Sequence, residues 1–181
     1  MGVVVPAQQP KTGPPPALPF FEWNRCPFEG CVYRKWKAEA PIALFSTWKT
    51  SRRKIGTLAT GDTVVALTGV VITFKPGVVR LDRDLPARDP NDADLRAGDT
   101  ILTYAYHGEG EATAWTKGRF YQSFDISFTT WPDGSGCQRD CAAKYVDIGR
   151  HDWWAKVRLR NGRTAWVLMD DANFSGVDRF G

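Results

Sequence analysis

The feature that most constrains this chain is a succession of short runs rich in Val, Ile, Thr, Tyr and Trp. Each run has the length of a strand and is bounded by Gly, Pro, Asn or Asp, which is typical of β-structure. No window repeats apolar residues at the spacing of a capped helix. The sequence therefore predicts an all-β protein, with helix limited to a turn near residues 140–144. The clearest runs are residues 63–73, 78–81, 100–106, 112–115, 119–124, 154–159 and 164–169.

Two segments that lie 37 residues apart repeat one turn pattern. Residues 58–64 are Leu-Ala-Thr-Gly-Asp-Thr-Val, and residues 95–101 are Leu-Arg-Ala-Gly-Asp-Thr-Ile. In each, the Gly-Asp pair is expected to form a tight turn, and the β-branched residues are expected to begin a strand. An internal repeat of this kind predicts two related modules.

A hairpin is predicted around Asn161-Gly162, because a type I′ turn needs positive φ at both of its central residues. In the strand before this turn, Trp154, Lys156 and Arg158 alternate with small or aliphatic residues. One face of the strand is therefore predicted to be apolar and the other to be charged and aromatic. A second turn flanked by aromatic residues lies at residues 115–120.

Ile55–Val65 and Trp154–Val167 together resemble the bacterial SH3-like family, often called SH3b. The family pattern is Leu-x-x-Gly-Asp-x-Val, then a Trp-x-Lys-Val strand and a closing Gly-x-x-Gly-Trp-Val hairpin. Ala165 stands where the family usually has Gly. Cys26–Trp36 also resembles a cysteine-flanked lead-in that precedes such domains in uncharacterised bacterial proteins. The resemblance covers residues 33–75 and 95–170 and implies small, partly open β-barrels that bind peptides or glycans without catalysis.

The predicted organisation is a tandem of two SH3-like β-barrels behind a disordered tail. The Pro-rich residues 1–22 are interpreted as an extended tether, residues 23–90 as the first barrel and residues 91–181 as the second. The acidic stretch 82–94 is the expected linker. Two alternatives stay open: the second barrel begins near Asp125, or the chain forms one elaborated barrel, because no closing hairpin separates the two Gly-Asp segments.

Charge and hydropathy bear on location. The chain has 24 Lys and Arg against 20 Asp and Glu, a net charge of +4, and its scattered basic residues do not predict nucleic-acid binding. No stretch reaches the roughly 18 apolar residues of a membrane span. Val5-Pro6-Ala7 resembles a signal-peptidase site before Gln8, although the basic and long apolar segments that should precede such a site are missing. Together with the cysteines, this predicts a periplasmic or secreted protein.

The four cysteines form two close pairs, Cys26 with Cys31 and Cys137 with Cys141. Disulfides, a four-thiolate zinc site and free buried thiols are the three interpretations. The gaps hold four and three residues, whereas zinc sites usually show two, so disulfides are favoured. Local pairing is preferred because neighbours in sequence meet easily. No metal and no cofactor is expected.

Aromatic residues are the candidate ligand-binding surface, because aromatic rings accept proline rings and sugar faces. The candidates are Trp153, Trp131 and Tyr121, with Arg158 on the charged face of its strand. Trp153 is expected to face solvent, because its neighbour Trp154 must point the opposite way. The alternative is that most of these aromatic side chains fill the cores of the barrels.

No catalytic residue is expected, and the chain is predicted not to be an enzyme. His107 and His151 are its only histidines, both are expected in loops or turns, and the usual hydrolase motifs are missing. The predicted function is an exported binding module for cell-wall glycan or peptide, or for an envelope protein. The alternatives are a scaffold without a small ligand and a hydrolase that uses Cys or His.

Overall fold

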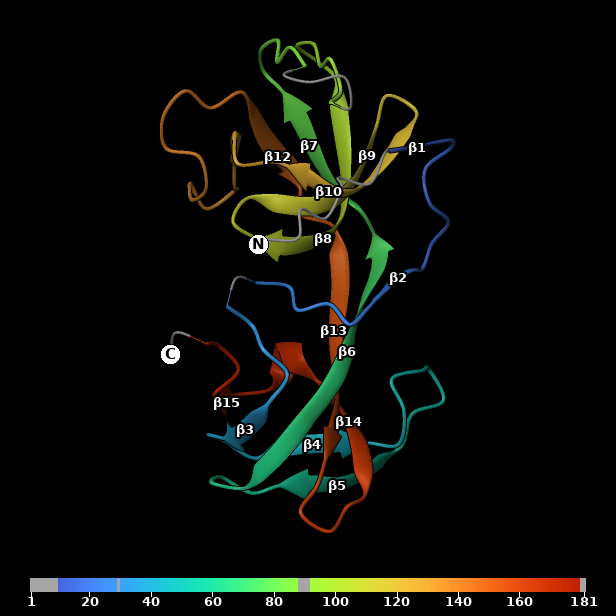
Figure 1. The fold of residues 1–181 in the computed structure, drawn as a ribbon, viewed down its shortest axis with the longest axis vertical. Helices are drawn as coiled ribbons and strands as arrows, with labels where there is room; N and C mark the ends of the chain where they lie inside the picture. Colours follow the sequence, from blue (N-terminus) through green and yellow to red (C-terminus); the bar gives the residue numbers. More distant parts are fainter. Residues whose placement is uncertain (1–9, 29, 88–91, 180–181) are drawn as a thin grey trace, which may run out of the picture. The chain divides into compact units, whose positions relative to one another are not determined.

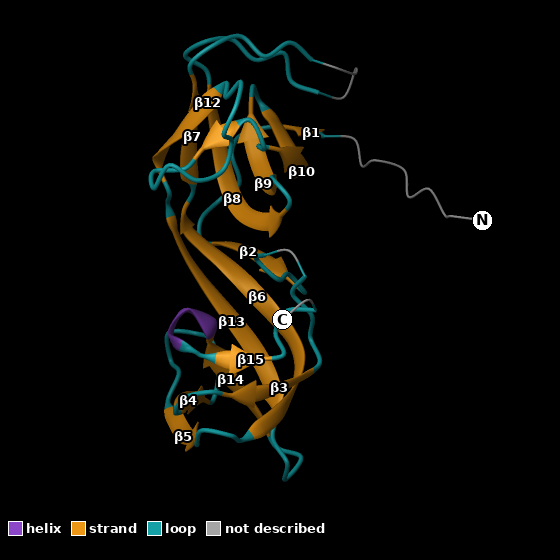
Figure 2. Cartoon of the chain, turned by 90° about the vertical axis from the view of Figure 1, so that its left-hand side faces the viewer, coloured by secondary structure: helices purple, strands orange, loops and turns teal. Residues whose placement is uncertain are grey.

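The computed structural model describes residues 10–28, 30–87 and 92–179, and strands account for nearly all of its regular structure (Figures 1 and 2). The all-β prediction is therefore confirmed. The helical turn predicted near residues 140–144 is wrong, because that stretch leads into a strand. The elements are β1 Lys11–Thr12, β2 Phe20–Trp23, β3 Lys35–Ala38, β4 Ile42–Phe45, β5 Lys54–Leu58, β6 Thr63–Lys75, β7 Gly77–Leu81, β8 Thr100–Gly108, β9 Glu111–Thr116, β10 Arg119–Asp125, β11 Thr129–Thr130, β12 Ala143–Asp147, β13 Arg150–Arg158, β14 Thr164–Leu168, the 3-10 turn η1 Met169–Asp171, and β15 Phe174–Ser175.

The strands form two curled sheets in two compact units (Figure 1). Unit 1 is Met1–Leu18 with Lys75–Arg150, and unit 2 is Pro19–Phe74 with His151–Gly181. The sheet of unit 1 has the order β1-β10-β9-β8-β7-β12-β11. The sheet of unit 2 has the order β15-β3-β6-β13-β14-β4-β5, and β2 also pairs with β6.

The units are nested in the sequence, which differs from the predicted division into residues 23–90 and 91–181. The chain leaves unit 2 at the end of β6, builds most of unit 1, and returns to unit 2 in β13. The described residues of the expected linker at 82–94 belong instead to unit 1. Two backbone hydrogen bonds join Leu85 to Leu95, and Leu95 is buried in the core of that unit.

The Pro-rich segment is paired with the sheets where the structure describes it, so the predicted tether is wrong from residue 11 onward. β1 pairs with β10 in unit 1, and β2 pairs with β6 in unit 2. The indole N–H of Trp115 also donates to the carbonyl of Gly13 at 2.9 Å. An edge strand needs hydrogen-bond partners on one side only, so flanking prolines are tolerated there. The possible processing site at residues 5–8 lies outside the described residues.

The two Gly-Asp segments form the same turn, as predicted. The Asp62 carboxylate accepts the backbone N–H of Ala59 at 2.8 Å, and the Asp99 carboxylate accepts that of Arg96 at 2.7 Å. The glycine before each Asp has φ of 89°. Each turn leads into a long strand, β6 in unit 2 and β8 in unit 1.

The strand framework around these turns is also repeated. In unit 2, β3 comes before the turn in the chain and pairs with β6, the strands β6, β13 and β14 are neighbours in the sheet, and the last strand, β15, pairs with the other edge of β3. In unit 1, β7 comes before the turn and pairs with β8, the strands β8, β9 and β10 are neighbours in the sheet, and the later strand β12 pairs with the other edge of β7. The two closing strands also have the same register, because the first residue of each pairs with the last residue of the strand beside it. Phe174 of β15 lies opposite Ala38 of β3, and Ala143 of β12 lies opposite Leu81 of β7. The two units are therefore topological repeats, and the closing hairpin of unit 2 comes after the whole of unit 1.

Both predicted local disulfides are present, Cys26–Cys31 in unit 2 and Cys137–Cys141 in unit 1, each with Cα atoms 5.6 Å apart. All four cysteines are thereby oxidised. Such bridges persist in oxidising compartments, which agrees with the predicted location. Within the described parts of the chain, no helix has the length and apolar character needed to cross a membrane.

Candidate ligand-binding surface

Trp153 is buried, with 8% of its surface exposed, so the prediction that it faces solvent is wrong. Its indole N–H donates to the Tyr33 hydroxyl at 3.2 Å. Its ring meets Phe28 and Trp36 edge to face, with centroids 5.9 and 6.4 Å apart. The strand alternation does hold, but Trp154 on the other face is fully buried as well. Both faces of β13 are covered at this point.

The other predicted ligand residues do not form one site with Trp153. Tyr121 lies in β10 with 7% of its surface exposed, and its ring packs 4.8 Å from Phe124 in the core of unit 1. Its predicted place on a ligand-binding surface is therefore wrong, and the alternative that such aromatic side chains fill the core holds for Tyr121. Trp131 is half-buried and lies in unit 1, whereas Arg158 is exposed near the last hairpin of unit 2.

The groups needed for the hydrolase alternative are placed differently from the prediction. His107 lies in β8 and His151 in β13, not in loops or turns. The Thr113 hydroxyl is 3.1 Å from Nε2 of His107. Because all four sulfur atoms are in disulfides, no cysteine thiolate is present to act as a nucleophile. That the chain is not an enzyme stays a prediction.

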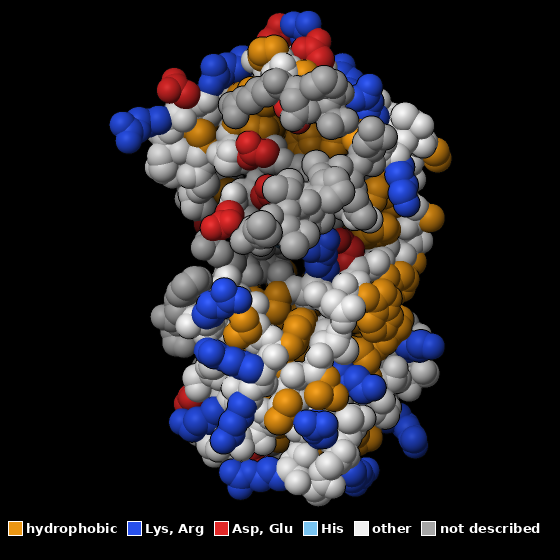
Figure 3. Space-filling view, in the orientation of Figure 1, with side chains coloured by type: hydrophobic (Ala, Val, Ile, Leu, Met, Phe, Trp, Pro, Cys, Tyr) orange, Lys and Arg blue, Asp and Glu red, His pale blue; other side chains and the backbone are white. Residues whose placement is uncertain are grey.

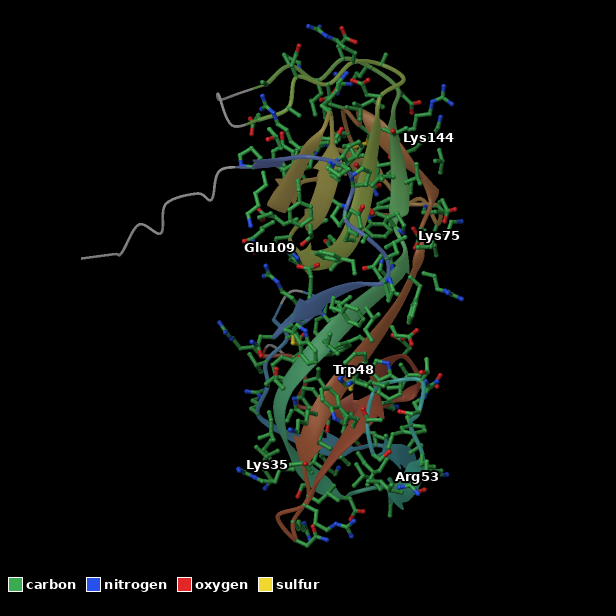
Figure 4. The ribbon with its side chains drawn as sticks, turned by 90° about the vertical axis from the view of Figure 1, so that its right-hand side faces the viewer. Lys35, Trp48, Arg53, Lys75, Glu109 and Lys144 are labelled. Carbon is green, nitrogen blue, oxygen red and sulfur yellow. A yellow bond between two sulfur atoms is a disulfide. The ribbon has the colours of Figure 1, made fainter. Side chains whose placement is uncertain are left out.

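Exposed aromatic side chains gather instead on one face of unit 2. We call this cluster of Phe21, Trp23, Trp48 and Trp166 the aromatic face. Trp23 is 49% exposed and Phe21 is 37% exposed, whereas Trp48 and Trp166 are half-buried. The four residues come from β2, from the loop between β4 and β5, and from β14. Figure 4 shows Trp48 on the side of unit 2 that faces the viewer.

The register of β2 explains why its aromatic residues lie on this face. Phe21 lies opposite Ile72 and Trp23 lies opposite Val70 in β6. Residues directly opposite one another in a sheet share a face. Val70 and Ile72 are buried, so they form an apolar floor beneath the exposed rings.

The rings of the aromatic face support one another. Trp48 lies between Phe21 and Trp23, with centroids 5.3 and 5.7 Å away and interplanar angles of 60° and 75°. Trp23 in turn meets Trp166 at 6.4 Å and 71°. Tilted and edge-to-face arrangements of this kind are favoured between aromatic rings. The face is therefore a preorganised surface.

Positive charge surrounds the aromatic face. The Lys49 ammonium lies 5.8 Å from the Trp48 ring centroid, and the Arg52 guanidinium lies 5.1 Å from that of Trp154. Lys156 lies directly opposite Trp166 in the sheet. By sequence, unit 2 holds 13 basic and 8 acidic residues, whereas unit 1 holds 11 and 12. On the side drawn in Figure 3, Lys and Arg side chains likewise outnumber acidic ones over unit 2.

Sequence reasoning missed this surface for two identifiable reasons. Phe20–Trp23 alternates in exposure as a half-buried strand does, but the predicted boundary between tail and first barrel, after residue 22, divides this strand. The basic residues at 49–54 belong to the scattered charge that does not predict nucleic-acid binding, although Trp48 adjoins them. The alternation of Phe21 and Trp23 is the signal that could have found the strand.

The chain was compared with protein-family models, with curated proteins and with solved structures, and none of the three comparisons found a match. The resemblance to the SH3b family and the binding role that it implies therefore stay predictions, to be judged on the residues of this chain alone.

Proposed function

We propose that this protein is an exported, non-catalytic binding module whose aromatic face recognises anionic cell-wall glycan. The observation that carries the proposal is the cluster of Phe21, Trp23, Trp48 and Trp166 at the surface of unit 2, surrounded by basic side chains. The sugar rings of a glycan present apolar C–H faces that pack on aromatic rings. Carboxylates on the glycan and on its attached peptides would pair with Lys49, Arg52 and Lys156.

The aromatic face is better explained by ligand binding than by a scaffold role without a ligand. Val70, Ile72 and Trp154 form a buried cluster, and Trp23 and Phe21 still expose 49% and 37% of their surface to solvent. Large apolar groups that gather at a surface usually mark an interaction site. The two disulfides and the SH3b resemblance support a location outside the cytoplasm, where cell-wall material is within reach.

The test is co-sedimentation of the oxidised full-length protein with purified cell-wall sacculi. Trp23→Ala is expected to weaken binding about tenfold, because exposed tryptophans often dominate the energy of an interface. Ile148→Ala is the matched control, since Ile148 is 57% exposed but belongs to unit 1. Binding should also weaken as salt is raised, because the basic residues are exposed and screened.

Two results would overturn the proposal. One is a folded wild-type protein that does not sediment with sacculi, which would favour an envelope protein partner or a scaffold role. The other is equal binding by Trp23→Ala and Ile148→Ala, which would place the binding surface elsewhere on the chain.

A further inference from the structure

Unit 1 contains a pocket that is separate from the aromatic face of unit 2. Its volume is about 210 Å³, and the residues that matter to the argument are Tyr106, Glu109, Ser127, Thr129, Trp131 and Gly136. Among the described residues that line it, there is no Lys, Arg or His. Trp131 was a candidate ligand residue on sequence grounds, and the structure brings it together with groups that the sequence did not connect.

Two aromatic rings form adjacent walls of the pocket. Trp131 meets Tyr106 at 85°, with centroids 5.6 Å apart. The Trp131 ring also stacks on the ring of Tyr145, with centroids 4.4 Å apart. The Tyr106 hydroxyl is held in place because it accepts the backbone N–H of Gly110 at 3.1 Å. The two walls are therefore fixed before any ligand arrives.

The remaining walls come from two tight loops. The turn between β8 and β9 carries Glu109 at φ of 51° (Figure 4). The loop that holds the Cys137–Cys141 disulfide contributes Gly136, and the backbone N–H of Cys137 donates to the Thr129 carbonyl at 3.1 Å. A Cβ on Gly136 would lie 2.4 Å from Cδ1 of Trp131. The loop thus approaches the indole as closely as a glycine allows.

Thr129 forms a buried part of the pocket wall. It lines the pocket and is 1% exposed. Its backbone N–H and carbonyl are both hydrogen-bonded, but its hydroxyl has no partner among the described residues. A buried hydroxyl without a partner destabilises a fold, and buried polar groups are nearly always satisfied. Less than 1 Å² of this hydroxyl oxygen is exposed, so it is not within reach of a ligand in the pocket.

We propose that this pocket binds a primary ammonium group on an alkyl chain, such as the side-chain amine of a lysine or of another diamino acid. The faces of Tyr106 and Trp131 attract a cation, and the Glu109 carboxylate provides the opposite charge. The ammonium has three N–H donors, which suit the oxygen atoms of Ser127 and Glu109 in the lining. The volume is below the range typical of drug-sized ligands and suits one side chain.

The test is a titration of the oxidised full-length protein with Nα-acetyl-lysine methylamide, followed by NMR at the indole N–H of Trp131. Saturable binding in the millimolar range is expected, because so small a ligand makes few contacts. The neutral probe, acetylated also at Nε, should bind at least tenfold more weakly. An amidated diaminopimelic acid derivative is the second arm, and the tighter of the two amines identifies whether the source is a lysine peptide or a cell-wall peptide.

Four variants separate a binding role from a structural one. Glu109→Gln removes the charge and should weaken binding of the lysine probe at least fivefold, whereas Glu111→Gln, at an exposed neighbour on β9 outside the lining, should leave it within twofold. Thr129→Val should leave binding within twofold and should not lower the unfolding midpoint, because it removes a buried, unsatisfied hydroxyl that the probe does not reach. Trp23→Ala in unit 2 should bind the probe as the wild type does.

The proposal is overturned if the folded wild type shows no saturable shift with either amine. It is also overturned if the neutral probe binds as well as the charged one, or if Glu109→Gln and Glu111→Gln behave alike. None of these outcomes bears on sedimentation with sacculi, so failure here is distinguishable from failure of the proposed cell-wall role.

Discussion

Trp153 and Trp23 show at the residue scale how burial separates structure from binding. Trp153→Ala is expected to lower the free energy of unfolding by about 3–5 kcal/mol, as large-to-small changes of buried aromatic residues do. Trp23→Ala should cost about 1 kcal/mol or less, since half of its side chain is already in solvent. Urea denaturation of both variants measures the difference, and equal losses would contradict the burial of Trp153.

Asp147 illustrates a residue-scale link between charge and stability. The Lys75 ammonium beside it, together with the backbone N–H of Gly149, holds the pKa of this carboxyl below its usual value of 3.8. Because the folded pKa is below the unfolded one, the stabilisation is present above about pH 4 and is lost as the pH falls through the folded pKa. Hydrogen bonds lower the pKa of Asp84 and Asp99 in the same way.

The expected outcome is that the stability of unit 1 declines as the pH falls below about 4, through the lowered pKa values of these carboxyls. Asp147→Asn should make this decline shallower, because it removes one carboxyl that titrates. The measurement is the urea midpoint of the wild type and the variant across that range. An unchanged slope in Asp147→Asn would show that the Lys75 pairing does not contribute to stability.

The repeated Gly-Asp turn gives a prediction at the scale of the element. Gly61 and Gly98 both have φ of 89°, and neither has a heavy atom within 4 Å of the position of an added Cβ. Alanine at either position should therefore destabilise by about 1–2 kcal/mol through backbone strain alone. Gly56→Ala is the control, because Gly56 is not in the positive-φ region and its Cβ would make an ordinary contact 3.8 Å from Leu44. The measurement is the thermal unfolding midpoint of the three variants. If Gly61→Ala is as stable as Gly56→Ala, backbone strain at the turn does not explain the choice of glycine.

Elements whose signal is local were predicted well from the sequence. The runs at residues 63–73 and 154–159 correspond to β6 and β13, because period-two alternation and turn chemistry act over a few residues. β1, β2 and β15 were missed, since they are two to four residues long and exist only through pairing with distant strands. For the same reason the aromatic face was missed, because β2 brings two of its four rings.

The nested order of the units belongs to the scale of the whole molecule and could not be predicted. In the sequence, the two Gly-Asp turns precede the strong closing hairpin, which is equally compatible with a tandem pair or a single barrel. Only the strand pairing shows that β13 and β14 complete the sheet begun by β3 and β6. The two ends of the inserted segment meet, since a Cβ on Gly149 would lie 2.5 Å from the Lys75 carbonyl oxygen. Insertion of a domain requires such closeness of its ends.

Nesting predicts which pieces of the chain fold. A chain in which an Asn-Gly turn replaces residues 76–149 should keep unit 2 folded, because β6 and β13 remain neighbours. Residues 75–150 should also fold alone, since β7 to β12 pair among themselves and only β1 is lost. Residues 19–74 should not fold, because they lack β13 and β14, which carry Trp154, Val157 and Val167 of the buried interior. NMR spectra of the three fragments provide the measurement. A folded 19–74 fragment would mean that the first half of unit 2 does not depend on the strands that follow unit 1, and the molecule would then be a tandem. An unfolded chain lacking 76–149 would mean that unit 2 needs unit 1 in order to fold, and the independence of the nested units would be wrong.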